Sequence, residues 1–189
     1  APGLPLLDVK LGPSRPPAPG VSLTGHSAYR GAPAAELGLR SACAHFISAE
    51  GGDRVMRDYK HKYQPSIREA APHSLLTVFV ICAATDAEAE RRAMSVDLRR
   101  LNMDYGINSP VPSQHEAETR AYTDIEKQRI TFHRRRAVIG NPDTVKAKLV
   151  ALAALFEADE VMVITITGDY STRLESYRLL AGAFGLSRT

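Results

Sequence analysis

The sequence predicts an α/β fold built from parallel βα units, and two observations carry this prediction. From Val21 to His45, a short β-type segment breaks at Gly25 into a polar turn, a brief helix ends at Gly38, and a second apolar run follows. Strand, turn, helix and strand in that order are typical of a right-handed βαβ unit. Residues 74–83 form a nearly continuous apolar run rich in β-branched side chains, which favours a parallel strand covered on both faces.

The first half of the chain contains two further predicted elements. After the strand at 21–24, a helix is expected at about 32–37, because Pro33 is accepted only in a first helical turn. A second strand is expected at 40–46, with His45 near its end. A helix is then expected over 50–70, which Pro65 ends or kinks. Its inner stripe has helical spacing and comprises Val55, Met56, Tyr59, Tyr63 and Ile67.

The middle of the chain is expected to be helical on either side of a long loop. Thr85 and Glu88 form a capping-box pattern that opens a helix running to about Leu101. Its inner side is formed by Ala89, Ala93, Val96 and Leu101. Residues 103–115 form a Gly/Asn/Ser/Pro loop longer than ordinary connections, which favours a site-covering lid or disorder. A charged helix is expected over 116–136.

The last part of the chain is again predicted to alternate between helices and strands. Asn141 as N-cap and Pro142 as first helical residue predict a helix that runs to about Glu157. Its apolar stripe comprises Val145, Leu149, Leu152 and Phe156. A fourth strand is expected at 160–167 and a last helix at 171–184, with Leu174, Tyr177 and Leu180 inward.

Composition limits the class of protein. The 189 residues suffice for one domain, expected at 21–189, after a Pro-rich extended linker at 1–20. A net charge of +3 is too mild to indicate nucleic acid or a membrane as partner. Cys43 and Cys82 lie within apolar runs, as buried free thiols do, so a reducing compartment is expected. With no apolar run long enough to span a membrane, we expect a soluble, cytoplasmic protein.

The turn after the first strand is the main candidate site. Gly25 lets the backbone bend, and the following amides lie at a helix start, which favours an anion. Ser27 adds a hydroxyl and Arg30 a guanidinium suited to phosphate oxygens. The alternative is that Ser27 merely caps the helix and Arg30 is solvated. Parallel strands place their carboxyl ends at one edge, so this turn is expected to meet His45, residues 83–85 and residues 167–169.

Other patterns point less sharply to chemistry. Three arginines follow His133, from Arg134 to Arg136, where a solvated helix end is the default interpretation and a second anion site is the alternative. The six histidines are scattered, without a metal-ligand pattern. No Gly-x-Ser-x-Gly elbow of a hydrolase occurs.

Several separated segments, in the same order, carry a resemblance to a known family. They comprise Leu23 to Tyr29, Ala34 to Leu39, Ala44 to Phe46, Thr85 to Ala89, Ile139 to Val145 and Ala158 to Val163. Over nearly all of Val21 to Leu186 the sequence resembles the bacterial luciferase-like flavin monooxygenases. In that family these segments belong to strands five to eight of a (β/α)8 barrel, so the resemblance implies a (β/α)4 half-barrel, the second half of a TIM-type barrel.

The resemblance implies a flavin site. The first turn, with Gly25, His26, Ser27 and Arg30, would meet the phosphate of FMN, and His45 would lie close to the flavin. Relatives usually carry a hydroxyl residue at the position of Arg30, and a small or acidic residue at that of His26. The loop at 103–115 falls where the family has its mobile, site-covering segment. Since the family's first four strands supply much of the pocket, full activity of this chain alone is not expected.

The implied reaction uses reduced FMN and dioxygen to insert one oxygen atom into a small organic substrate, with a flavin reductase as a possible partner. His45 would supply a proton or a hydrogen bond, or would be an ordinary core residue. Two open sheet edges favour a homo-oligomer or a missing N-terminal half. A non-catalytic flavin-binding or oligomerising half-barrel and a deazaflavin-dependent oxidoreductase remain alternatives.

Overall fold

A computed structural model describes residues 20–25, 28–67 and 69–186, so the predicted linker lies almost wholly outside the described residues. One five-stranded sheet, parallel throughout, is formed by β1 (Ser22–Gly25), β2 (Arg40–Ala44), β3 (Ser74–Cys82), β4 (Ala137–Gly140) and β5 (Glu160–Ile164). The helices are α1 (Ala28–Glu36), α2 (Gly52–Lys62), α3 (Asp86–Asp104), α4 (Gln114–Thr119), α5 (Asp124–Arg134), α6 (Pro142–Leu155) and α7 (Tyr170–Ala183). The predicted α/β class and the parallel β1–α1–β2 unit are confirmed.

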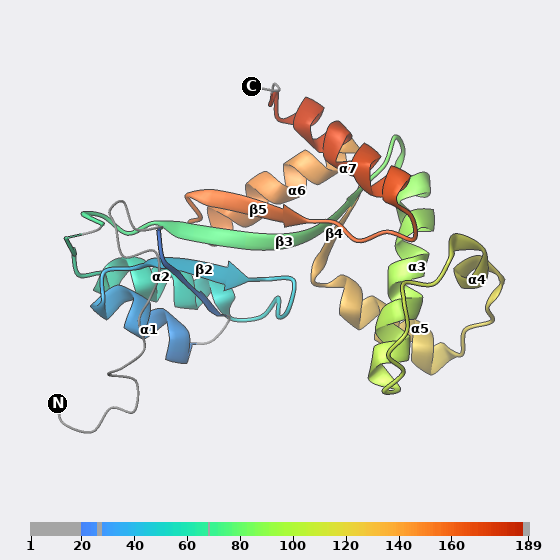
Figure 1. Ribbon diagram of the computed structural model, residues 1–189, viewed down its shortest axis with the longest axis horizontal. Helices are drawn as coiled ribbons and strands as arrows, with labels where there is room; N and C mark the ends of the chain where they lie inside the picture. Colours follow the sequence, from blue (N-terminus) through green and yellow to red (C-terminus); the bar gives the residue numbers. More distant parts are fainter. Residues whose placement is uncertain (1–19, 26–27, 68, 187–189) are drawn as a thin grey trace, which may run out of the picture.

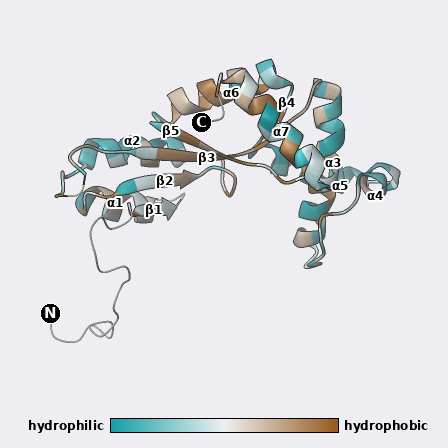
Figure 2. Ribbon diagram, turned by 45° about the horizontal axis from the view of Figure 1, so that its top comes forward, coloured by the Kyte–Doolittle hydropathy of each residue, from teal (hydrophilic) through white to brown (hydrophobic). Residues whose placement is uncertain are grey.

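Strand β3 is the centre of the core, as its continuous apolar run predicts. Its even-numbered side chains, such as Leu76 and Val80, pack with α2, α6 and α7 in one apolar cluster. Its odd-numbered side chains Phe79 and Ile81 pack with α3 and β4 in a second cluster. Figure 2 shows β3 as a hydrophobic ribbon between more polar helices. The strand is therefore covered on both faces, as parallel strands are.

Different strands pair with the two halves of β3. Strand β2 pairs with the first half of β3, up to Ala44 opposite Thr77. Strand β4 pairs with the second half, beginning with Ala137 opposite Phe79. Strand β5 pairs with β3 from Leu75 to Phe79. Helices α3, α4 and α5 lie together at the end of the sheet toward which β3 points (Figure 1).

Two helix boundaries differ from the sequence prediction. Helix α1 begins at Ala28, so Pro33 lies inside it rather than in its first turn. Helix α2 ends at Lys62, where Tyr63 turns to extended backbone, instead of continuing toward residue 70. Ile67 was expected on the inner stripe but is 104% exposed, because the helix that would have turned it inward has already ended.

The charged segment 116–136 is not one helix. It divides into α4 and α5, because Ser113 and Thr123 each form a capping box that starts a new helix. The prediction also missed β4, a strand of only four residues that follows the second of these helices. So short a segment forms a strand through its pairing with β3, which the sequence pattern does not reveal.

The remaining helix starts agree with the prediction in most details. Asn141 caps α6 by accepting from Thr144 N–H, and Pro142 follows as first helical residue. Thr85 caps α3 by accepting from Glu88 N–H at 3.2 Å. The capping box there is half formed, because the Glu88 carboxylate binds Arg91 and Arg92 instead of returning to the backbone.

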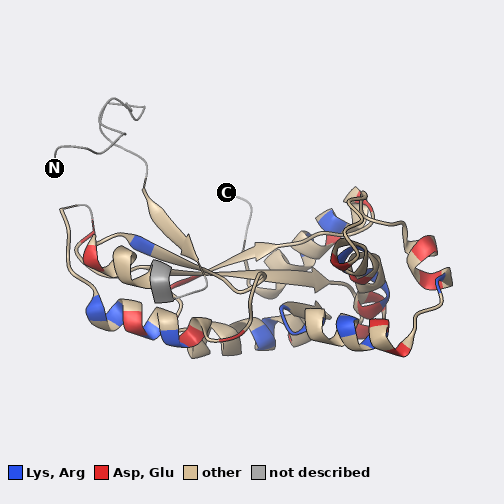
Figure 3. Cartoon of the chain, turned by 90° about the horizontal axis from the view of Figure 1, so that it is seen from below, with Lys and Arg blue, Asp and Glu red and all other residues tan. Residues whose placement is uncertain are grey.

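Charge and apolar surface are distributed unevenly. Lysine, arginine and acidic residues lie mainly on the helices, and the sheet is almost uncharged (Figure 3).

Among the described strands, β5 pairs on one side only, with β3. An apolar groove of about 480 Å³ lies beside it between α6 and α7, lined by residues including Val161, Val163, Tyr177 and Phe184. None of the described helices is long and apolar enough to cross a membrane.

Candidate functional site at the carboxyl ends of the strands

The first two strand ends lie side by side, as predicted. Gly25 ends β1 and pairs with Cys43 of β2, two residues before His45. The turn that leaves Gly25 enters α1 at Ala28, so the start of that helix faces the same edge as the end of β1. His26 and Ser27 lie outside the described residues. Arg30 lies in the first turn of α1, and its side chain is outside the described part of the chain.

His45 is a buried side chain on the helix-covered face of the sheet. It is only 4% exposed, and its ring meets Phe156 edge to face with centroids 5.7 Å apart. Burial lowers the pKa of its imidazole below the usual 6.5, which keeps the ring neutral at neutral pH. Its Nδ1 atom is buried and has no hydrogen-bond partner among the residues that the structure describes. Such an atom is a rare feature in a folded protein and marks a place where a ligand or water can bind.

The turn that follows His45 is held from two sides. Phe46 N–H donates to the Thr77 carbonyl at 3.3 Å, which continues the pairing of β2 with β3. Arg136, which directly precedes β4, donates from its Nη1 atom to the Ile47 carbonyl at 2.8 Å. The end of β2 is therefore held both by the central strand β3 and by Arg136 at the start of β4.

The expectation that all strand ends meet at one place is only partly correct. Gly25 is level with Cys43, which pairs with Leu76 of β3, whereas Ala83 follows much later along the same strand. At about 3.3 Å per residue this offset is roughly 20 Å along the strand. The structure therefore brings Gly25 and His45 together and places the end of β3 apart from them.

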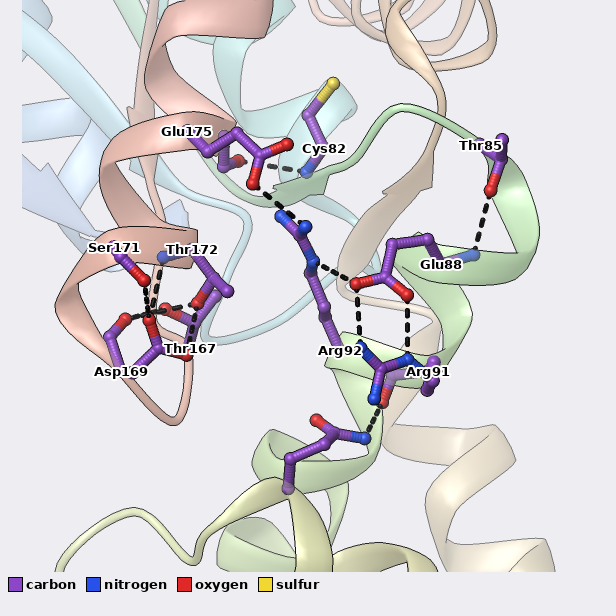
Figure 4. Close-up of polar contacts among 12 residues, drawn as sticks. Cys82, Thr85, Glu88, Arg91, Arg92, Thr167, Asp169, Ser171, Thr172 and Glu175 are labelled. Atoms are coloured by element: carbon purple, nitrogen blue, oxygen red, sulfur yellow. Dashed lines mark hydrogen bonds and ion pairs between the residues drawn. The ribbon is translucent and has the colours of Figure 1, made fainter.

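The segment after β5 and helix α3 line a polar pocket of about 250 Å³, of which the sequence prediction named only residues 167–169. It is lined by Arg91, Arg92, Ser113, Gln114, the segment 167–169 and Thr172. Figure 4 shows Arg91 and Arg92 of α3 together with Thr167, Asp169 and Thr172. Arg92 binds Glu88 at 2.7 Å and Glu175 at 2.9 Å, and its buried Nη1 atom has no partner within the described part of the chain. The helical spacing of Glu88 and Arg92 was visible in the sequence, but the contact with Glu175 was not.

Electrostatics make this pocket unsuited to phosphate. Hydrogen bonds from Arg91 and Arg92 lower the pKa of Glu88 to about 2, so that carboxylate stays charged. Glu118 binds Arg91, Glu175 binds Arg92, and Asp169 caps α7 by accepting from Thr172 N–H. The carboxylates outnumber the guanidinium groups, and Asp169 already occupies the helix start. The charge balance of the pocket therefore suits a neutral polar group at Arg92 Nη1 better than an anion.

The long loop reaches this pocket. It runs between α3 and α4, and a Cβ atom at Gly168 would lie 3.4 Å from the Pro112 carbonyl and 3.3 Å from Ser95 Oγ. The end of the loop therefore packs against the carboxyl end of β5. A role of this loop as a covering segment stays a prediction.

The basic triplet after His133 is not simply solvated. Arg135 fits the default interpretation, with a side chain 60% exposed. Arg134 binds the buried carboxylate of Asp97 at 2.6 Å, and Arg136 contacts His133 and Ile47. The described residues contain no cluster of three or more His, Cys, Asp and Glu side chains suited to a metal ion.

Comparison with known proteins shows what the chain is similar to. No protein-family model matches it. It is 38% identical over 183 residues to the uncharacterized protein YceB of Bacillus subtilis (strain 168), covering 97% of this chain and 55% of that protein. It is 24% identical over 159 residues to a luciferase-like monooxygenase of Escherichia coli (strain K12), covering 84% of this chain and 48% of the relative. The chain thus spans about half the length of the curated relatives it matches.

Solved structures share the fold. The crystal structure of apo-MsnO8 matches with a TM-score of 0.85 and 33% identity, over 97% of this chain and 56% of that one. The oxygenating constituent of 3,6-diketocamphane monooxygenase from Pseudomonas putida, solved in complex with FMN, matches with a TM-score of 0.50 and 19% identity, over 86% and 47% of the two chains. The chain is therefore related in sequence to a protein named luciferase-like monooxygenase, and it shares the fold of flavin-dependent monooxygenases of that type.

Proposed function

We propose that this chain is the carboxyl-terminal, flavin-binding part of an FMN-dependent monooxygenase that uses reduced flavin and dioxygen on a small organic substrate. The observation that carries the proposal is the fold similarity over nearly the whole chain, which includes a neighbour solved with FMN. The share of the relatives that the chain covers supports a half-barrel that a further half would complete. A separate flavin reductase would supply the reduced cofactor.

The turn between β1 and α1 is the proposed phosphate site. It connects a strand end to a nine-residue helix, whose free N–H groups and dipole favour an anion. Ser27 would donate its hydroxyl and Arg30 would offer a bidentate guanidinium. The pocket at β5 lacks the positive charge for this role, as the carboxylates around Arg92 show.

His45 fits a position close to the flavin. Its unpartnered Nδ1 atom lies one strand away from Gly25, and its neutral ring can accept or donate one hydrogen bond. Bound FMN would supply the redox chemistry with dioxygen, which no side chain can perform. The residues of this chain would bind the phosphate, exclude water and hold a hydrogen bond at His45 Nδ1.

Titration of the purified chain with FMN, riboflavin and a phosphate-bearing deazaflavin, followed by flavin fluorescence, tests this proposal. We expect FMN to bind at least about tenfold more tightly than riboflavin, because a charge-assisted phosphate contact contributes more than 1.4 kcal/mol. Arg30→Ala and Ser27→Ala should weaken FMN binding and leave riboflavin binding unchanged. Arg54→Ala, which changes an exposed arginine of α2, is the matched control.

The outcomes separate the alternatives. Equal binding of FMN and riboflavin would contradict a phosphate site in this turn. Preference for the deazaflavin would favour the oxidoreductase alternative.

We further propose that the free edge of β5 is covered by the half of the barrel that this chain lacks. Among the described strands it pairs with β3 alone, so its other edge is open beside an apolar groove, and Met162 on it is 50% exposed. Such an edge pairs readily with another strand. Sedimentation of the chain alone and of Met162→Lys tests this: self-association that Met162→Lys abolishes would show a homo-oligomer at this edge instead.

A further inference from the structure

Two arginines meet at one histidine on the side of β3 that faces α3. The Arg100 Nη1 atom donates to the His133 carbonyl at 3.2 Å, and the Arg136 Nη2 atom donates to His133 Nδ1 at 2.6 Å. Arg100 belongs to α3 and Arg136 precedes β4, so the fold brings together side chains that are distant in the sequence. His133 is buried, at 7% exposure.

Both guanidinium groups are held in fixed orientations. An arginine can only donate, so Nδ1 of His133 accepts and its Nε2–H donates to the Asp104 carboxylate at 2.7 Å. Asp104, His133 and Arg136 thus form a chain that orients Arg136. Arg100 lies over the Phe79 ring, with its central carbon 4.7 Å from the ring centroid. Such prearranged donors lose little freedom when they bind a ligand.

The positive charge of this pair is incompletely balanced. The neighbouring Arg134 binds Asp97 and Glu90, and Arg135 binds Glu50. Within the described part of the chain, neither Arg100 nor Arg136 has a carboxylate at ion-pair distance, and the Nε atom of Arg136 is buried without a partner. Burial, followed by the charge of Arg136, lowers the pKa of Arg100 to about 10. Two such cations attract an anion.

We propose that Arg100 and Arg136 bind the carboxylate of a small organic acid. Arginine is the side chain best matched to carboxylate oxygens, because its donors form a planar fork. A monoanion is favoured over a phosphate dianion, because Asp104 binds His133 and Asp97 acts electrostatically on Arg100, so that the two carboxylates offset part of the charge. Arg136 also holds the turn after His45, so the anion would lie beside the proposed flavin site. This places organic acids as the substrate class and rests on the proposed function, but the binding itself requires no flavin.

The test is a titration of the full chain, without flavin, with N-acetylglycine and with its neutral analogue N-acetylglycinamide. Binding is followed through the arginine Nε–H signals in ¹H–¹⁵N NMR spectra. We expect the acid to shift the Arg100 and Arg136 signals and the amide to leave them unchanged. Arg100→Met and Arg136→Met should each weaken binding of the acid at least tenfold, whereas Arg99→Met, a change at the adjacent residue, should leave it within twofold.

Three outcomes would overturn the proposal: equal response to acid and amide, equal effects of Arg100→Met and Arg99→Met, or tighter binding of inorganic phosphate than of the acid. Arg100→Lys keeps the charge and guards against a folding artefact, and it should retain part of the affinity. Because flavin is absent from this titration, failure of FMN binding and failure of acid binding are separate results. Binding of the acid by a chain that does not bind FMN would support the anion site alone.

Discussion

Ser176 of α7 is expected to contribute measurably to stability, because it replaces a missing strand partner. Strand β5 pairs with β3 only as far as Phe79, so the end of β3 extends beyond its neighbour. There the Cys82 N–H donates to Ser176 Oγ at 2.9 Å, and both residues are fully buried. Thr165 acts in the same way, donating its hydroxyl to the Val80 carbonyl at 2.8 Å. Two hydroxyl groups thus continue the hydrogen bonding where the strand ends.

The change Ser176→Ala removes the acceptor and leaves the Cys82 N–H buried without a partner. An orphaned buried donor costs about 1–3 kcal/mol, and the free energy of unfolding should fall by that amount. For a domain of this size each kcal/mol lowers Tm by about 2–4 °C. Urea denaturation followed by circular dichroism measures the change. Arg178→Ala, at an exposed position of the same helix, is the control and should stay within about 0.5 kcal/mol. Equal stability of the two variants would refute the reasoning.

Further predictions follow from burial and pKa. Burial raises the pKa of both Cys43 and Cys82 to about 11, so the folded state keeps its thiol protons where the unfolded state loses them. This contribution to stability is complete below about pH 9 and is lost as pH rises toward 11; a Cys43→Ala/Cys82→Ala variant should show a flatter stability profile. Glu88 should titrate near pH 2 in ¹³C NMR spectra, and the stabilisation it gives should disappear as pH falls from 4.5 toward 2. Met56→Ala should cost about 2–5 kcal/mol in urea denaturation, because Met56 is buried, whereas Ile67→Ser should change stability by less than about 0.5 kcal/mol. A large loss with Ile67→Ser would contradict the early end of α2.

Local sequence patterns predicted the elements whose causes are local. The apolar run of β3 and the capping residues Thr85 and Asn141 act over a few neighbouring positions, and the structure confirms them. The pattern around Gly25 likewise predicted a parallel βα unit. These features depend on backbone preference and burial, which a short segment of sequence specifies.

Errors arose where a local pattern allowed two structures. The charged segment from 116 to 136 has helical composition throughout, but two capping boxes divide it and pairing with β3 makes a strand of its continuation. Ile67 has helical spacing, but α2 ends before it. Composition does not reveal these boundaries, because a cap or a strand partner decides them.

The candidate sites show the same division. The sequence by itself determined the class of the fold, the buried thiols Cys43 and Cys82, and the placement of Gly25 and His45 at neighbouring strand ends. Only the tertiary structure decided that the sheet is staggered, that Arg92 is neutralised by Glu88 and Glu175, and that Arg100 and Arg136 meet at His133. The physical reason is range: burial periodicity and capping act within a few residues, whereas charge pairing and desolvation depend on side chains that only the packed chain brings together.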